Sequence, residues 1–224
     1  MTTSALDPRA GFVRYLRQGF LRANTPEIQR MSVALCRLLA HGLPVTREEP
    51  AAACGVSRER IGQLLDEFPR SVLDLDERGA IVAFGGLSLA PTRHSLVTDA
   101  RELYTWCVLD ALFLPEILGT NAILTTHCPG SGAELTVDLS PGAVRAARPA
   151  GTVMSIVGTD REACCDNLRN AFCDKVNLFR DAQTFAAWAR GRADIGCVTL
   201  AEAQDFARQR NALRYPDVDL TERP

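Results

Sequence analysis

Apolar and polar positions recur with helical spacing in the N-terminal part of the chain. Residues 12–22 carry apolar side chains on one side, which predicts an amphipathic helix docked on the rest of the protein. A second helix is expected from Thr25, with Pro26 at its first position and Gly42 at its end. The apolar side of the first segment consists of Phe12, Val13, Leu16 and Phe20.

The next segments predict two more helices and a hairpin. Thr46 and Glu49 have the spacing of a capping box for a short helix, and Ser57 is placed to cap the helix after it. Two apolar runs on either side of residues 76–79, Asp-Glu-Arg-Gly, predict a β-hairpin. Three helices followed by a hairpin form the layout of a winged helix. We therefore predict a winged-helix-like domain in residues 1–90. The third helix would place four apolar residues on one face: Ile61, Leu64, Leu65 and Phe68.

After Asp99 the pattern changes. Residues 100–114 are apolar on every side, which predicts a buried helix ending before Pro115. Strands and helices then follow each other without regular alternation, so we expect an α+β fold, with residues 91–224 as a mixed α/β domain containing small antiparallel sheets. The predicted strands are 121–127, 133–139, 151–157 and 194–200, and the predicted helices are 161–172, 181–192 and 201–213.

The composition limits the classes of function. Hydrophobic residues make up 46% of the chain and charged residues 23%, as in globular proteins, and the net charge is −2. A general attraction to nucleic acid or anionic membrane is therefore not expected. No signal peptide or membrane span is evident, so we expect a cytoplasmic protein whose eight cysteines stay reduced. No two cysteines have Cys-x-x-Cys spacing, which argues against a zinc ribbon or a thioredoxin motif.

The most apolar segment carries both a thiol and a carboxylate. In residues 104–115, YTWCVLDALFLP, Cys107 and Asp110 would share one helix face, with their Cβ atoms about 5–6 Å apart. Burial disfavours ionisation of both groups, so each is able to pass a proton to the other or to a ligand. In the structural alternative, Cys107 is a small core residue and Asp110 caps a helix beginning at Ala111.

The other cysteines suggest fewer roles. Cys173 lies between a predicted helix and a predicted strand, where its thiol is able to face a cleft. Cys128 ends a strand beside His127, for which a structural role is favoured over metal binding. The adjacent Cys164 and Cys165 have diverging side chains, which do not easily bind one ion together. The remaining cysteines lie in apolar patterns and are expected in the core: Cys36, Cys54 and Cys197.

Three segments, taken together and in order, resemble the bacterial organomercurial lyases, also called alkylmercury lyases. They are residues 101–119, RELYTWCVLDALFLPEILG, residues 125–128, TTHC, and residues 169–179, RNAFCDKVNLF. The resemblance covers about residues 84–190 and extends more loosely upstream, where this family has a winged-helix-like domain not known to read DNA. The family motifs correspond here to Arg101, Leu103, Tyr104, Trp106, Cys107 and Asp110, and to Phe172 and Cys173.

The resemblance implies roles for particular residues. Cys107 and Cys173 match the two mercury-binding catalytic cysteines, and Asp110 matches the catalytic acid and completes the expected mercury site, where mercury is substrate and product. Cys128 matches a structural cysteine. Some members have another cysteine directly after the second one, where this chain has Asp174. The implied reaction is protonolysis of the carbon–mercury bond of alkyl- and arylmercury compounds, giving a hydrocarbon and Hg(II). Residues 91–224 would then be the catalytic, mercury-binding domain.

The chemistry of the residues agrees with this resemblance. Thiolate is the protein ligand that a soft metal such as mercury prefers, and Tyr104, Trp106 and Phe113 would form an apolar wall for the organic group. No cofactor is expected, because mercury stays at +2. Small thiols are expected as co-reactants for product release, and a mercuric reductase as the acceptor of Hg(II) in mercury detoxification and resistance.

A regulator is the main alternative function. A winged-helix protein that responds to soft metals or thiols would bind DNA through its third helix, which here spans residues 58–67. That segment carries two arginines against three acidic residues, a net charge of −1. A DNA-reading helix normally needs a basic face to neutralise phosphates. The sequence therefore favours a lyase that binds no nucleic acid and no membrane.

Overall fold

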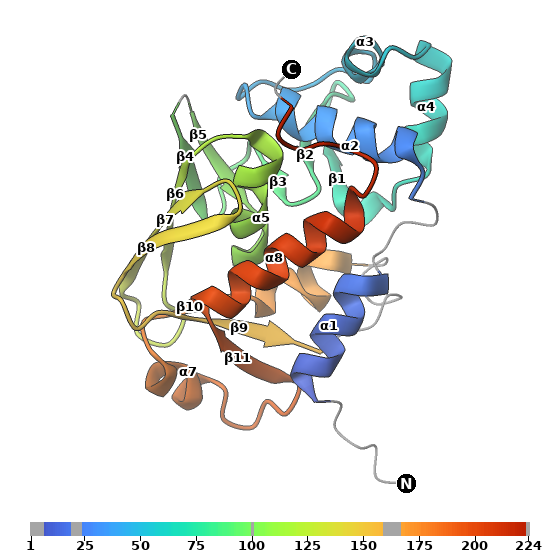
Figure 1. The fold of residues 1–224 in the computed structure, drawn as a ribbon. Helices are drawn as coiled ribbons and strands as arrows, with labels where there is room; N and C mark the ends of the chain where they lie inside the picture. Colours follow the sequence, from blue (N-terminus) through green and yellow to red (C-terminus); the bar gives the residue numbers. More distant parts are fainter. Residues whose placement is uncertain (1–6, 19–23, 100, 159–166, 223–224) are drawn as a thin grey trace, which may run out of the picture.

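The structure is a computed structural model that describes residues 7–18, 24–99, 101–158 and 167–222. Figure 1 shows a mixed α/β arrangement in which helices pack against two sheets. The helices are α1 (Pro8–Gln18), α2 (Pro26–Leu39), α3 (Glu49–Cys54), α4 (Arg58–Asp66), α5 (Val108–Leu118), α7 (Ala182–Trp188) and α8 (Leu200–Arg214). Two 3-10 turns are η1 (Arg70–Val72) and η2 (Cys173–Lys175).

The strands form two antiparallel sheets, with orders β1-β2-β3-β5-β4-β6-β7-β8 and β10-β9-β11. Antiparallel pairing agrees with the prediction, but the eight-stranded sheet is larger than the small sheets expected. The first sheet comprises β1 (Leu73–Leu75), β2 (Ile81–Phe84), β3 (Leu87–Ser88), β4 (Ser95–Thr98), β5 (Glu102–Thr105), β6 (Ala122–His127), β7 (Glu134–Ser140) and β8 (Ala143–Arg148). The second comprises β9 (Val153–Val157), β10 (Leu178–Phe179) and β11 (Ile195–Thr199).

The N-terminal helices follow the sequence signals in most respects. The Thr25 hydroxyl accepts a hydrogen bond from the backbone N–H of Ile28, which caps α2 as predicted. Ser57 caps α4 in the same way. The predicted capping box at Thr46 is wrong, because α3 begins only at Glu49. The Glu49 carboxylate instead accepts a hydrogen bond of 2.6 Å from the Thr46 N–H and closes the turn before the helix.

The first helix and the hairpin also form near their predicted positions. Helix α1 begins at Pro8, four residues before the predicted start, and buries Phe12 and Leu16. Phe20 lies outside the described residues. Strands β1 and β2 pair across the turn at residues 76–79. The sheet continues from β2 through β3 and β5 without a break. The division into domains 1–90 and 91–224 stays a prediction.

The predicted helix over residues 100–114 is wrong. Residues 102–105 form β5, and α5 begins at Val108 and continues through Pro115 to Leu118. Strand β5 is only four residues long, and its buried positions Leu103 and Thr105 lead almost directly into the apolar sequence of α5. Periodicity does not separate so short a strand from the helix that follows it. Pro115 only removes one N–H from the helix, so α5 extends three residues beyond it.

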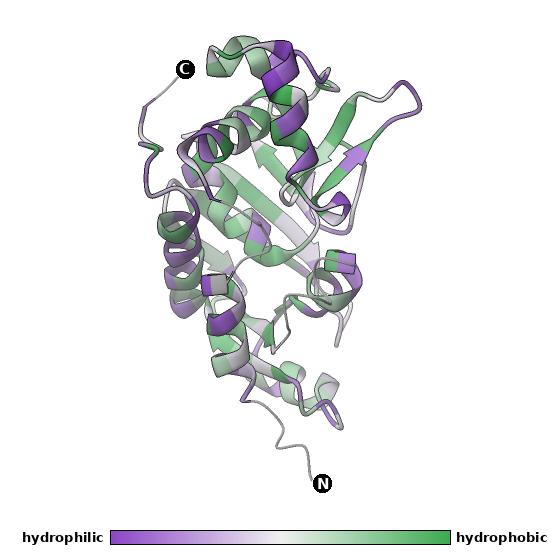
Figure 2. Cartoon of the chain, turned by 90° about the vertical axis from the view of Figure 1, so that its right-hand side faces the viewer, coloured by the Kyte–Doolittle hydropathy of each residue, from purple (hydrophilic) through white to green (hydrophobic). Residues whose placement is uncertain are grey.

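Helix α5 forms the centre of the core. It packs between β5 and β7 of the large sheet on one side and α2 and α8 on the other. Figure 1 shows α8 crossing in front of it, with α1 beside the small sheet. Figure 2 shows hydrophobic residues concentrated in the strands and in the inner helix, while the outer helices carry hydrophilic stretches. Among the described helices, none combines the length and apolar character needed to cross a membrane.

Candidate active site

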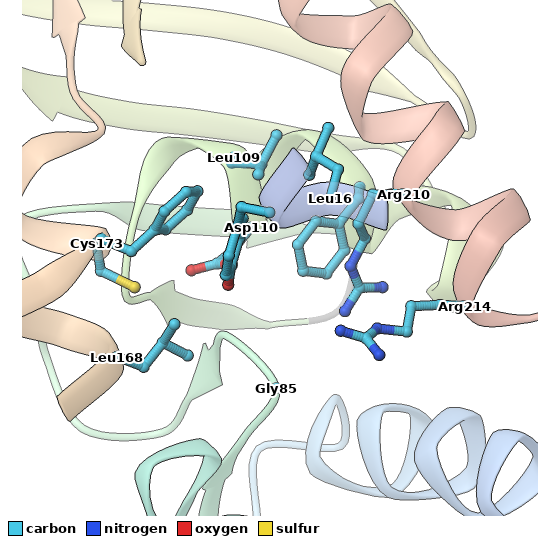
Figure 3. Close-up of a pocket in the computed structure, with 11 residues that line it drawn as sticks. Leu16, Gly85, Leu109, Asp110, Leu168, Cys173, Arg210 and Arg214 are labelled. Atoms are coloured by element: carbon cyan, nitrogen blue, oxygen red, sulfur yellow. The ribbon is translucent and has the colours of Figure 1, made fainter. Parts of the chain in front are cut away.

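Three of the residues singled out from the sequence lie together in the structure. The sulfur atoms of Cys107 and Cys173 and a carboxylate oxygen of Asp110 all lie within 4.8 Å of one another, and all three residues are buried. Cys107 and Asp110 come from the start of α5, whereas Cys173 begins η2, 63 residues after Asp110 in the chain. Figure 3 shows the Asp110 carboxylate and the Cys173 sulfur facing the same cavity.

The start of α5 fixes the first two of these side chains. Cys107 is the N-cap residue, and its backbone N–H donates a 2.9 Å hydrogen bond to Oδ2 of Asp110, the third residue of the helix. The structural alternative for Asp110 was therefore right in kind, because the carboxylate does cap a helix. It was wrong in position, since the helix begins at Val108 and not at Ala111. The capping bond holds the carboxylate beside the thiol.

Contacts of the residues on either side, Phe172 and Asp174, hold Cys173 in place. The side chains of Arg93 and Asn177 donate hydrogen bonds of 3.2 and 2.9 Å to the carbonyl oxygen of Asp174, the next residue. On the other side, the Phe172 ring stacks 4.4 Å from the Tyr15 ring of α1. The short turn that carries Cys173 is thus attached to both the large sheet and the first helix.

A buried histidine extends this support and was not singled out from the sequence. The Nε of Arg93 donates a 3.1 Å hydrogen bond to Nε2 of His94. Because an arginine only donates, Nε2 must be unprotonated and the neutral ring carries its proton on Nδ1, which lies 2.8 Å from Oγ1 of Thr126. Burial, together with the Arg93 charge, lowers the His94 pKa to about 3. In the sequence His94 is a single histidine in a polar segment, and nothing there indicates that it would accept a hydrogen bond from Arg93 in the core.

Two glycines next to the carboxylate were also missed. Gly86, between β2 and β3, has a φ of +105°, and a Cβ atom there would lie 2.4 Å from Cγ of Asp110. Its carbonyl oxygen accepts a hydrogen bond from the Trp106 N–H. Only glycine allows this turn to approach the carboxylate so closely. The Gly85-Gly86 pair between two apolar runs was the available signal, since glycine in a strand pattern often marks close backbone approach.

Burial determines the protonation of the cluster. It raises the pKa of Asp110 to about 6, against the opposing effects of hydrogen bonds with Cys107 and of nearby arginines. Burial also raises the pKa of Cys107 well above its usual value. A hydrogen bond with Cys107 lowers the Cys173 pKa, but burial and nearby carboxylates outweigh it and the pKa is raised. At pH 7 both thiols are therefore protonated, while Asp110 is mostly ionised.

The cluster opens into a small cavity of about 30 Å³, enough for about two water molecules. Of the predicted aromatic wall, only Phe113 is among the described residues that line it. Trp106 faces a separate groove beneath the Arg169 guanidinium, and Tyr104 lies half-buried on β5. The lining consists of Tyr15, Leu16, Gly85, Leu109, Asp110, Phe113, Leu168, Phe172, Cys173, Arg210 and Arg214.

The other cysteines that the structure describes, and His127, lie outside this cluster. Cys36 is buried and Cys54 partly buried, as expected for core residues. The prediction for Cys197 is wrong, because its side chain on β11 is exposed. Cys128 is buried, and the pKa of its thiol is lowered by hydrogen bonds with Ser131 and neighbouring backbone, despite burial. His127 is exposed, and Cys164 and Cys165 lie outside the described residues.

Comparisons with known proteins point to one family. A family model described as "MerB: Alkylmercury lyase" matches residues 87–210. The alkylmercury lyase of Staphylococcus epidermidis is 31% identical over 206 residues, 92% of each chain. That of Pseudomonas putida is 33% identical over 193 residues, covering 86% of this chain and 88% of the relative. The crystal structure of the mercury-bound form of MerB2 matches with a TM-score of 0.71 and 18% identity, over 93% of this chain and 98% of that one, which supports the fold.

Proposed function

This chain belongs to the alkylmercury lyase family, and we propose that Cys107, Asp110 and Cys173 perform its carbon–mercury bond cleavage. The activity is protonolysis of alkyl- and arylmercury compounds to a hydrocarbon and Hg(II). One observation carries the assignment of residues: two thiols and a protonatable carboxyl group lie within 4.8 Å of one another in a buried cluster. Mercury is the substrate atom, and two sulfur ligands suit its soft character.

The proton balance follows from the protonation of the site. The substrate arrives as R–Hg–SR′, and one cysteine thiol replaces the SR′ ligand, which leaves as R′SH with the cysteine proton. The second cysteine then binds mercury and gives its proton to the Asp110 carboxylate. Asp110 donates that proton to the carbon atom, the C–Hg bond breaks, and R–H leaves. Mercury stays at +2, bound by Cys107 and Cys173.

Asp110 suits both halves of this transfer. A pKa of about 6 leaves the carboxylate mostly ionised at pH 7, so it is ready to take a proton from a thiol. The same pKa lies near the operating pH, where a general acid is most effective, so the protonated form of Asp110 is able to donate its proton to the carbon atom. The capping bond from the Cys107 N–H keeps the second carboxylate oxygen available for the transfer.

We also propose that the N-terminal region supports the site and does not read DNA. Helices α2–α4 and the β1–β2 hairpin follow the order of a winged-helix-like domain in residues 1–90. Gly86, at the end of this region, lies against Asp110. Helix α4 has too little positive charge for phosphate contacts. Family membership supports the lyase and gives no support to the alternative of a regulator.

Release of the product needs an exchange partner. Hg(II) held by two buried thiolates should leave slowly unless another thiol takes it over. We propose small thiols as co-reactants, a mercuric reductase as acceptor in the cell, and no resident cofactor. A cytoplasmic reaction agrees with these requirements, because thiols stay reduced there.

The test is release of benzene from phenylmercury in excess small thiol. The wild-type protein should release benzene over many turnovers, whereas Cys107→Ser and Cys173→Ser should release none, because a hydroxyl is a hard and poorly acidic ligand. Cys197→Ser makes the same chemical change at an exposed position and should keep the full rate. Benzene release by Cys173→Ser at the wild-type rate would contradict the assignment.

A further inference from the structure

Two arginines line the same cavity as Asp110 and Cys173. Arg210 and Arg214 lie in the last part of α8, one helical turn apart, and both are half-buried. Figure 3 shows their guanidinium groups across the cavity from Cys173, with the Asp110 carboxylate between them. The protonolysis proposed above uses neither of them.

The lining therefore carries more positive than negative charge. Asp110 is the only carboxylic acid among the described lining residues, against two arginines. The Arg210 guanidinium lies 3.7 Å from the centre of the Phe113 ring and donates a 2.9 Å hydrogen bond to Oδ1 of Asn211. These contacts orient the group without neutralising it. An incoming cation would be repelled here, and an anion attracted.

The chemistry of mercury limits what arrives at this cavity. A free R–Hg⁺ ion is soft and binds any available thiol, so in a thiol-rich solution the substrate is R–Hg–SR′. The SR′ part differs in charge from one thiol to another: amino-acid and peptide thiols bear a carboxylate, and the part is anionic as a whole where no ammonium group balances it. A guanidinium group is well suited to bind a carboxylate through two parallel hydrogen bonds.

We infer that Arg210 and Arg214 select organomercury–thiolate adducts whose thiolate part carries a carboxylate. The inference rests on the proposed function, since it concerns the form in which the substrate reaches Cys107 and Cys173. A cavity of about 30 Å³ is too small for a whole adduct, so it must widen around the mercury and its organic group. The carboxylate end stays at the arginines, and the displaced thiol leaves past them with its proton.

The experiment uses phenylmercury supplied as preformed adducts with three small thiols. These are 3-mercaptopropionate, which is anionic, 2-mercaptoethanol, which is neutral, and cysteamine, which is cationic. Benzene release is measured at low substrate concentration to give kcat/KM for each adduct. The Hg–S bonds of the three adducts differ in intrinsic lability. For each adduct, the wild-type kcat/KM is therefore divided by the kcat/KM of the Arg214→Gln variant, and this quotient cancels the difference.

The arginine pair predicts a graded result. The quotient for the anionic adduct should exceed that for the cationic adduct by about tenfold, the range of a hydrogen bond to a charged group. Like Arg214→Gln, Arg210→Gln should lower kcat/KM more for the anionic adduct than for the cationic adduct. Arg208→Gln removes one charge from the same helix at an exposed position paired with Asp205, and should leave all three rate constants unchanged.

The outcomes separate the two proposals. Equal quotients for the three adducts, with benzene released from each, would overturn selection by the arginines and leave the lyase function standing. The same holds if Arg208→Gln abolishes the preference as strongly as Arg214→Gln, since only the overall charge would then matter. Absence of benzene from every adduct with the wild-type protein would instead contradict the proposed function itself.

Discussion

Replacing Asp110 by asparagine should make the protein more stable and inactive at the same time. Asparagine keeps a side-chain oxygen that is able to accept the hydrogen bond from the Cys107 N–H, now 2.9 Å long, so the cap of α5 survives. It removes a carboxyl group whose pKa burial raises from the usual 3.8 to about 6. The change separates the structural role of Asp110 from its chemical role.

The size of the stability change follows from this pKa. Because the folded-state pKa is raised, the wild-type protein has its full stability from this group below pH 4 and loses it as the pH rises through 6. A shift of about two pKa units corresponds to a loss on the order of 3 kcal/mol. The asparagine variant has no such loss. The difference in unfolding free energy between variant and wild type should therefore rise by that amount between pH 4 and pH 7.5.

Urea unfolding of the wild-type protein and the asparagine variant across this pH range measures the difference in unfolding free energy. Contributions of the other titrating groups are the same in both proteins and cancel. A difference that stays flat with pH would mean that the Asp110 carboxyl is not desolvated. Activity is measured by single turnover, with bound phenylmercury and released benzene quantified separately. Binding of phenylmercury should be retained, while the rate of benzene release should fall by a factor of about 10² to 10⁴ or more, the usual contribution of general acid catalysis. Undiminished release would show that the proton comes from another group.

Three further changes test the surroundings of the cluster. Gly86→Ala should lower benzene release, because its Cβ would displace the neighbouring Asp110 carboxylate. Gly79→Ala is the control, since Gly79 also has a positive φ but a Cβ there would have nothing within 4 Å. It should lower the free energy of unfolding in urea by about 1–2 kcal/mol and leave benzene release unchanged. Arg93→Met should slow single-turnover release by about tenfold or more through misplacement of the second thiol, and should weaken the ultraviolet absorption of the mercury–thiolate complex. Among the six cysteines that the structure describes, iodoacetamide should label Cys197 first, as judged by mass spectrometry, without loss of activity.

Local sequence signals predicted the fold best where a cap or a turn carries the information. Thr25 and Ser57 begin their helices as expected, and the hairpin at residues 76–79 is in place. The signals failed where apolar character is continuous. Before Cys107 a four-residue strand, buried only at alternate positions, leads almost directly into a helix that is apolar on every side, and so short an alternation does not mark the boundary between them.

The candidate site was predictable in part for a different reason. Cys107 and Asp110 are close in sequence, so any helix start places them together, but the approach of Cys173 depends on a tertiary contact between η2 and α5. No spacing rule predicts that contact, and only the resemblance to known lyases indicated it. Arg93 and Gly86 were missed because their roles arise from what lies opposite them in space.

The capping geometry also explains why the structural and chemical interpretations of Asp110 are not alternatives. A helix N-terminus in a dry core needs an acceptor for its first N–H groups, and a carboxylate three residues after the cap supplies one. The same backbone bond aims the carboxylate at the cap residue, so a cysteine there acquires a proton acceptor at no additional cost in ordering. Burial then raises the pKa toward neutrality, which an exposed cap would not do. The buried capping box, with a thiol at its first position, is thus already a pair that is able to transfer a proton. Cys173 adds a second soft ligand, and the two thiols together suit mercury.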